Sequence, residues 1–192
     1  MRLITLIVLT ITTSFLLGCS GPLPQRINLA PEITSVPRLP QSMPVRVIVN
    51  DSNLRKEIGT VTDRLGHTVP VHVTDNIRNE IHSAITQTLN RMNVISSSAA
   101  SSQLTLTIDN LTYNLRSDGI RRELIGEMRI SMQVVDGNRR YQNSFQSNRR
   151  EEIFRTPSEL RSHEFINALA NDVLFQAFND PEFTSFLIAG AR

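Results

Sequence analysis

The chain has 192 residues, of which 40% are apolar and 5% aromatic, and it contains no tryptophan. This length holds one domain with a core of mainly Leu, Ile and Val, and it is too short for two comfortable domains. The formal net charge of +2 supplies no overall field that would attract nucleic acid, although the sequence pI is about 9.2.

Residues 1–18 are predicted to be a secretory signal peptide. Arg2 gives a positive start, and the apolar run from Leu3 to Leu17 would reach only about 22 Å as a helix, short of the ~30 Å core of a bilayer. Gly18 and Cys19 follow. Cys19 is the only cysteine of the chain, so it cannot form an internal disulfide and its thiol needs another role.

Residues 16–20, Leu-Leu-Gly-Cys-Ser, resemble the bacterial lipobox, although the family usually has Ala, Ser, Thr or Val in place of Leu17. The resemblance implies that diacylglycerol is joined to the sulfur of Cys19, that the chain is cut between Gly18 and Cys19, and that the new amine is acylated. Ser20 stands where an Asp would signal inner-membrane retention, which implies sorting to the outer membrane, facing the periplasm. The alternative is an unmodified buried cysteine after an ordinary signal peptide.

Residues 19–44 are predicted to be a tether between the lipid and the domain. Six of the nine prolines fall in this stretch, and proline fixes φ and removes a hydrogen-bond donor. Roughly 24 extended residues could span up to ~80 Å. Ile27 to Ile33 could still lie on the domain surface. Residues 45–192 form the single domain, which is expected to fold from about Met43 onward without the tether.

The first half of the domain is predicted to contain two or three strands and a helix. Alternating valines indicate strands at residues 45–50 and 69–73, with residues 51–66 ambiguous between them. Pro70 favours an edge position for the second of these strands. Thr74 or Asp75 can cap the helix, whose apolar face would contain Ile77, Ile81, Ala84, Ile85, Leu89 and Met92.

Three further strands are predicted between residues 104 and 145. The apolar positions change parity between Ile108 and Leu111, which predicts a β-bulge near Asp109-Asn110. The motif Asp136-Gly137-Asn138 indicates a hairpin turn. Apolar residues before it have even numbers and those after it odd numbers, so cross-strand partners must sum to an odd number. A two-residue loop satisfies this, either Asp136-Gly137 or Gly137-Asn138.

The second helix is predicted to begin with Thr156 as its cap, Pro157 in the first turn and Glu159 completing a capping box. Its apolar face would contain Leu160, Phe165, Ile166, Leu169, Val173, Ala177 and Phe178. Asp180-Pro181 would end it and start a short last helix. The predicted fold is α+β, an antiparallel-rich sheet with two amphipathic helices on one face in the order β-(β)-β-α-β-β-β-α.

This layout resembles the YajG-type lipoproteins of Gram-negative bacteria. The resemblance rests on the lipobox, the sequence Ala30-Pro31-Glu32-Ile33, the strand 45–50 followed by Asp51, the two helices, and the Ala191-Arg192 end. It covers essentially the whole chain, and its motifs apart from Cys19 are weak. It implies a location and an architecture, but no catalytic residue, because no activity is established for the family.

The sequence shows no evident catalytic, cofactor or metal site. His67, His72, His82 and His163 have no metal-ligand spacing, and no serine sits in a Gly-x-Ser-x-Gly elbow. No Gly-rich phosphate loop is present. The Arg doublets at 121–122, 139–140 and 149–150 would split between the two faces of a strand, which argues against a nucleic-acid surface.

Three hypotheses for function follow. The first is a lipid-anchored periplasmic binding or accessory module without catalytic activity, whose partner is another envelope protein or peptidoglycan. The second is an envelope hydrolase that acts on cell-wall or glycan material through carboxylates of the predicted hairpin, Glu123, Glu127, Glu151 and Glu152. Neighbouring arginines explain these carboxylates more simply as cross-strand ion pairs. The third is a purely structural lipoprotein with no specific partner.

Overall fold

The structure is a computed structural model that describes residues 23–51, 56–62, 66–118 and 121–191. Its elements, in chain order, are β1 (Gln25–Ile27), β2 (Val45–Asp51), β3 (Glu57–Thr62), β4 (Thr68–Val73), α2 (Ile77–Arg91), β5 (Ser102–Asp118), β6 (Arg121–Asp136), β7 (Arg139–Ile153), α3 (Glu159–Phe178) and α4 (Pro181–Ala189). The predicted α+β class and element order are confirmed, with β3 as the uncertain strand and β1 as an addition.

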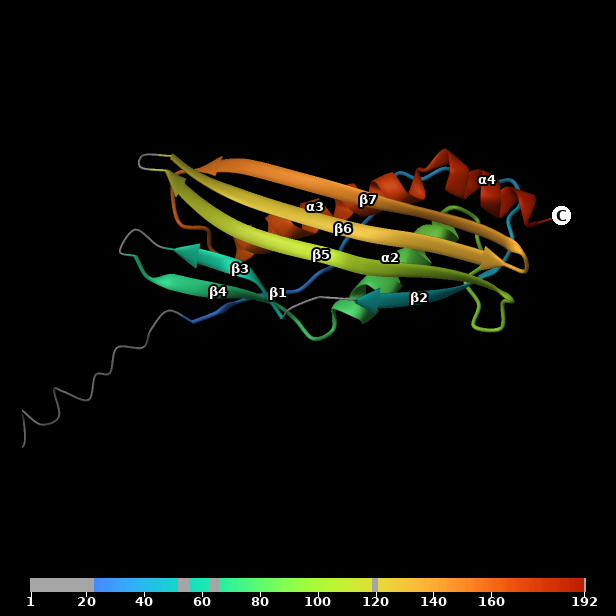
Figure 1. Ribbon diagram of the computed structural model, residues 1–192, viewed down its shortest axis with the longest axis horizontal. Helices are drawn as coiled ribbons and strands as arrows, with labels where there is room; N and C mark the ends of the chain where they lie inside the picture. The colour runs from blue at the N-terminus through green and yellow to red at the C-terminus, as the bar shows by residue number, and fades with distance from the viewer. Residues whose placement is uncertain (1–22, 52–55, 63–65, 119–120, 192) are drawn as a thin grey trace, which may run out of the picture.

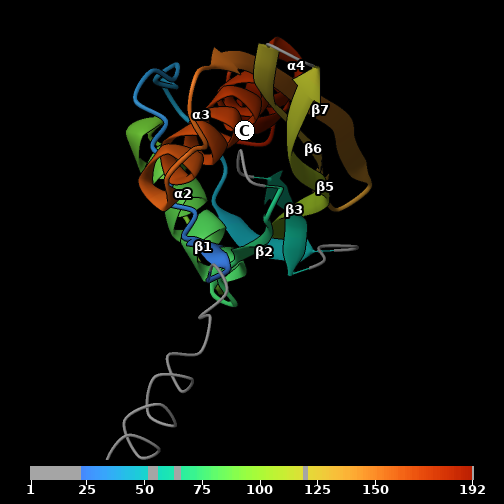
Figure 2. The same ribbon diagram turned by 90° about the vertical axis from the view of Figure 1, so that its left-hand side faces the viewer.

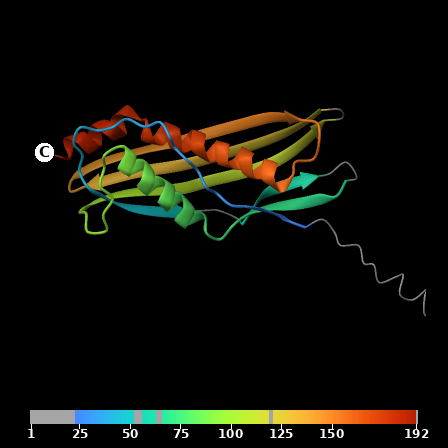
Figure 3. The same cartoon turned by 180° about the vertical axis from the view of Figure 1, so that it is seen from behind.

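One seven-stranded sheet, mostly antiparallel, runs the length of the molecule (Figure 1). Its order is β1-β4-β3-β5-β6-β7, and β2 pairs in parallel with β5. β2 pairs with residues 102–108 of β5, whereas β3 pairs with Tyr113 and Asn114 farther along the same strand. α2 and α3 cover one face of the sheet and leave the other open (Figure 3).

The core lies between the sheet and these helices. Side chains alternate across a strand, so the even-numbered residues of β6 from Arg122 to Val134 are buried while the odd-numbered ones point to the open face. In β5 the pairing register with β6 shifts between Ile108 and Asn110, which confirms the predicted bulge. The extra residue keeps both Ile108 and Leu111 on the core side.

The β6–β7 hairpin confirms the parity argument. Asp136 pairs with Arg139 and Val135 with Arg140, so partners sum to 275 and the loop is Gly137-Asn138. Gly137 has φ +57°, a left-handed conformation that glycine adopts without a Cβ clash.

The helix starts differ from the predictions. Asn76, not Thr74 or Asp75, occupies the cap position of α2 and makes no side-chain capping bond. α3 begins at Glu159 with Ser158 as its cap, because the Thr156 hydroxyl instead accepts a hydrogen bond from Arg122. Leu160 is 69% exposed, so its predicted place on the apolar face is wrong. It precedes the buried Leu169 by nine residues, about two and a half turns, and therefore lies on the opposite side of the helix. Asp180 caps α4 as expected.

Pro70 lies in a strand with neighbours on both sides. β4 sits between β1 and β3, so the predicted edge position is wrong for the strand as a whole. β1 pairs only with residues 71–73, and therefore Pro70 itself faces a strand on the β3 side alone. The missing N–H of proline is tolerated at such a position.

The segment from Gln25 to Met43 is part of the folded domain, which corrects the tether predicted over residues 19–44. Its apolar side chains reach the core with exposures of 0–4%: Ile27, Leu29, Ile33, Leu39 and Met43. It begins as β1 beside β4 and then runs between α2 and α3 (Figure 3). Prolines indicated an extended segment correctly, but an extended segment can also be buried.

Asparagine side chains of α3 hold this segment in place. Asn167 Oδ1 accepts from the backbone N–H of Ala30 at 2.7 Å, and Asn171 Oδ1 accepts from that of Glu32 at 2.8 Å. Asn179 donates to the carbonyl of Ser35 at 3.0 Å. Because the three asparagines lie four and eight residues apart, they form one row along the helix. This row supplies partners that a neighbouring strand would otherwise provide.

We predict that Leu29→Ala lowers the free energy of unfolding by about 2–5 kcal/mol, because it empties a fully buried site. Denaturant titration of residues 20–192 measures this change. Leu23→Ala is the control: that side chain is 84% exposed, so a change within about 0.5 kcal/mol is expected. Equal, small effects of both substitutions would contradict the packing of residues 25–43.

Candidate functional site

The predicted lipid attachment site, Gly18 and Cys19, lies outside the described residues. The described chain starts at Leu23 and enters β1 two residues later. Lipidation of Cys19 therefore stays a prediction from the lipobox, and the site analysis concerns the folded domain that follows it.

Strand alternation separates the four glutamates proposed for a hydrolase. Glu123 and Glu127 lie on the open face of β6, and Glu152 is paired with Glu123 from β7. Glu151 pairs with the buried Leu124, so it lies on the opposite face, toward α3. The four carboxylates therefore do not converge on one place.

Three of these carboxylates have arginine partners. Arg150 Nε lies 3.9 Å from Glu123, Arg129 Nη2 lies 3.3 Å from Glu127, and Arg161 of α3 contacts Glu151. Glycoside hydrolysis requires two carboxyl groups across a space that holds the sugar. None of four cavities around the described residues is lined by two of these glutamates. The geometry gives the hydrolase hypothesis no support.

The histidines do not form a metal site. His67 lies just before β4, His72 within it, His82 on α2 and His163 on α3. Within the described ranges, no three His, Cys, Asp or Glu side chains are grouped so that they could hold a metal ion. His72 alone lines a cavity.

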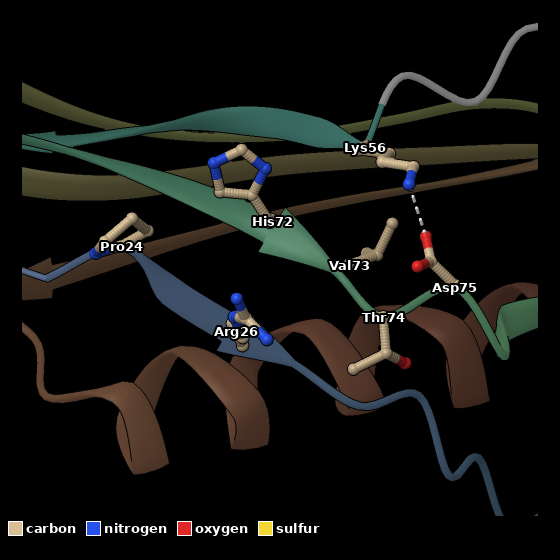
Figure 4. Close-up of a pocket in the computed structure, with 7 residues that line it drawn as sticks. All are labelled: Pro24, Arg26, Lys56, His72, Val73, Thr74 and Asp75. Carbon is tan, nitrogen blue, oxygen red and sulfur yellow. Dashed lines mark ion pairs between the residues drawn. The ribbon is translucent and has the colours of Figure 1, made fainter.

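This cavity, of about 430 Å³, lies where β1, β4 and the start of β3 meet (Figure 4). The parallel pairing of β1 with β4 places Arg26 opposite His72. Lys56 and Asp75 form an ion pair of 2.8 Å across its mouth (Figure 4). The hydrogen bond and charge of Lys56 lower the pKa of Asp75 below its ordinary value.

The cavity holds polar groups of both signs rather than a catalytic pair. Arg26 and Lys56 bring positive charge, while Asp75 balances Lys56 and Glu57 of β3 is the cross-strand partner of His72. Among these described lining residues, no nucleophile is hydrogen-bonded to a base.

A second hollow lies along the segment that joins β7 to α3. It has a volume of about 490 Å³, and its lining residues are Glu152, Ile153, Phe154, Arg155, Thr156, Pro157, Ser158 and Arg161. Gln25 of β1 donates to the carbonyl of Pro157 at 3.0 Å. The Gln25 side chain also accepts from Ser162 at 2.7 Å. β1 is therefore hydrogen-bonded to the segment that lines this hollow and to the first part of α3.

Asp180 is a carboxylate that accepts hydrogen bonds from two side chains and from the backbone. It accepts from the Tyr141 hydroxyl at 2.5 Å, from Asn143 at 2.9 Å and from the backbone N–H of Glu182 at 2.9 Å. Burial favours its neutral form, but these hydrogen bonds outweigh it, and the pKa of Asp180 is lowered. Burial and the adjacent carboxylate raise the pKa of Tyr141, which therefore stays a donor. The cluster joins β7 to the start of α4.

Sequence reasoning missed Arg26, Thr74 and Asp75 as cavity residues, as well as the asparagine row. One signal was available for the row: Asn167, Asn171 and Asn179 recur at helical spacing. Lys56 stood out only as the single lysine of the chain. The cavity residues come from three separate segments, so no local motif connects them.

A family profile described as an uncharacterised lipoprotein matches residues 31–188. The chain belongs to this family, the YajG family. Membership implies an envelope protein anchored to a membrane, and it indicates no catalytic function. No curated protein matches this chain. In the part of the chain that the structure describes, no helix is both long and apolar enough to cross a bilayer.

Two solved structures were compared with this lipoprotein. Protein XCC0632 from Xanthomonas campestris, of the family DUF330, superimposes with a TM-score of 0.56 at 8% identity, over 87% of this chain and 97% of that one. The PelC dodecamer from Paraburkholderia phytofirmans reaches a TM-score of 0.37 at 12% identity, over 77% and 96% of the two chains. The first similarity shows a common fold, and the second is too low to support an argument.

We predict that Asp180→Asn lowers the free energy of unfolding at pH 7 by about 1–3 kcal/mol, because a charged acceptor of several hydrogen bonds is lost. The folded pKa lies below the unfolded value, so this stabilisation is complete above the unfolded pKa and is lost as pH falls through the folded pKa. The wild type should therefore lose more stability than the variant between pH 5 and acid conditions, roughly pH 2.

Denaturant titrations across this pH range test the prediction. Asp172→Asn is the matched control, since that carboxylate is 52% exposed and pairs only with Arg149 at 3.5 Å. Its substitution should change stability by less than about 1 kcal/mol. Parallel pH curves for the wild type and Asp180→Asn would refute the assigned role of Asp180.

Proposed function

We propose that the protein is a lipid-anchored accessory module of the outer membrane, that it faces the periplasm, and that it binds another envelope protein without catalysing a reaction. The supporting observation is how soon the folded domain follows the predicted lipid. Cys19 precedes Gln25, the first residue of β1, by six positions, which span at most about 21 Å when fully extended.

The short connection restricts the possible partners. A tether of ~80 Å would have let the domain reach far into the periplasm. With β1 held in the sheet and residues 25–43 packed in the core, the domain stays at the membrane that holds the lipid. A partner in or next to that membrane fits this position better than the peptidoglycan layer, the other candidate.

A catalytic role finds no support in the geometry. The hairpin glutamates are divided between two faces, and three of them are ion-paired. A purely structural lipoprotein without a partner remains an outcome that the experiments below distinguish.

We predict that Cys19→Ala abolishes incorporation of a labelled fatty acid, because no other cysteine can form the thioether. Labelled fatty acid is fed to cells and the protein is recovered by immunoprecipitation. A companion variant, Ser20→Asp, should keep its label but move to the inner membrane in a density gradient. Label on Cys19→Ala would refute the lipid assignment, and an unchanged gradient position for Ser20→Asp would refute the sorting signal.

The partner can be sought by site-specific photo-crosslinking in intact cells. Thr107 and Gln133 point to the open face of the sheet, so a crosslinker there samples the face that α2 and α3 do not cover (Figure 2). A crosslinker at Gln87, on the exposed side of α2, samples the helical side for comparison. One stoichiometric protein adduct supports the proposal. An adduct with peptidoglycan fragments, or none at any position, would contradict it.

A further inference from the structure

Five large apolar side chains are exposed among the described residues, and three of them gather at one end of the molecule. The exposures are 84% for Leu23, 81% for Phe154 and 69% for Leu160. The other two, Ile95 at 67% and Phe175 at 46%, lie elsewhere. Exposed apolar side chains that cluster indicate a contact surface, whereas single ones are ordinary.

The three residues flank one contact between β1 and the start of α3. Gln25 donates to the carbonyl of Pro157, so these two segments lie side by side. Leu23 precedes Gln25 by two residues, while Phe154 and Leu160 lie three residues before and after Pro157. Figures 1 and 3 show the start of β1, the end of β7 and the start of α3 at the same end of the long sheet.

Charged side chains of both signs lie near this apolar group. Arg26 and Lys56 line the hollow beside β1 together with Asp75, and Arg155 and Arg161 line the hollow before α3 together with Glu152. Arg161 is ion-paired with Glu151 and Glu164, and Lys56 pairs with Asp75 at the exposed rim. Apolar tips with arginine and lysine side chains among their neighbours match the boundary between acyl chains and headgroups.

We propose that this end of the domain, formed by Leu23, Phe154 and Leu160 with Arg26 and Lys56 beside them, rests directly on the phospholipid surface. The proposal rests on the lipid at Cys19, because only four positions separate that residue from Leu23. The occupant is identified by where the chain leaves the domain and by the exposed apolar side chains at that end. The long strands then point away from the membrane, and the Gly137-Asn138 turn and α4 lie farthest from it (Figure 1).

The absence of tryptophan makes a direct test possible. Phe154→Trp and Phe175→Trp each introduce a single fluorophore, the first in the proposed contact and the second near the end of α3. The lipidated full-length variants are reconstituted into phosphatidylethanolamine–phosphatidylglycerol vesicles with brominated acyl chains, which quench tryptophan at the lipid boundary. Quenching by at least about half is expected for Phe154→Trp and little for Phe175→Trp, since only the former enters the apolar boundary.

A second measurement uses residues 20–192 without lipid, which contain every core residue described. Their partition onto the same vesicles is compared for the wild type, for Leu23→Ser/Phe154→Ser/Leu160→Ser and for the control Ile95→Ser/Phe175→Ser. The triple variant should bind at least about tenfold more weakly, and the control within about twofold of wild type. Arg26→Gln/Lys56→Gln should also weaken binding, more strongly at low salt than at high salt.

Several outcomes would overturn the proposal. Equal quenching of the two tryptophan variants would place the end away from lipid. Equal loss of binding by the triple variant and its control would remove the patch as the cause. A wild type that is dimeric by sedimentation, with a monomeric triple variant, would identify the patch as a self-association surface. Failure of lipidation would appear separately, as full-length protein that does not float with vesicles.

Discussion

The packing of residues 25–43 into the groove between α2 and α3 is the constraint on which the rest of the domain depends. The segment places Leu29 and Ile33 beneath the helices and extends the sheet through β1. Its backbone is satisfied by the asparagines of α3 and by Arg91 of α2, which contacts the carbonyl of Ile33. Without it, two amphipathic helices would expose apolar surface to water along the seam between them.

A chain of hydrogen bonds extends this constraint to the sheet. The hydroxyl of Tyr113, buried in β5, lies 2.7 Å from that of Ser162 on α3, and Ser162 donates to Gln25 of β1. The ring of Tyr113 packs edge-on against Phe165, with centroids 5.6 Å apart. One buried polar row therefore sets the positions of three elements, and it also fixes where the chain leaves the domain toward its predicted anchor.

Periodic features were predictable from the sequence because they depend on neighbouring residues. The bulge between Ile108 and Asn110 and the loop Gly137-Asn138 follow from the parity of apolar positions. The burial of residues 25–43 was not predictable, since the partners of Ala30 and Glu32 lie more than 130 residues away. The predicted start of α3 was wrong for a similar reason. The hydroxyl of Thr156, the predicted cap, accepts a hydrogen bond from Arg122 of a distant strand, and Ser158 caps the helix instead.

In the candidate site, too, some features were predictable from the sequence and others were not. Cross-strand pairing of the hairpin glutamates was foreseeable from neighbouring arginines, and the structure contains it between Glu123 and Arg150. Glu127 pairs instead with Arg129 of its own strand. The hollow beside β1 was not foreseeable, because Arg26 comes to lie opposite His72 only when a three-residue strand from the start of the domain joins β4. Cys19 is recognised by a covalent-modification motif, which no property of the fold tests.

The route of the N-terminal segment also bears on secretion. Ser35 is bonded to Asn179, 144 residues later, and the N–H of Met43 donates to the carbonyl of Leu187. The groove that receives residues 25–43 is therefore incomplete until the last helices have been made. Contacts so distant in sequence form slowly, since a long loop must close before they stabilise anything. If residues 1–18 direct export as predicted, the chain crosses the membrane from its N-terminus and cannot complete this core until its C-terminal helices have also crossed.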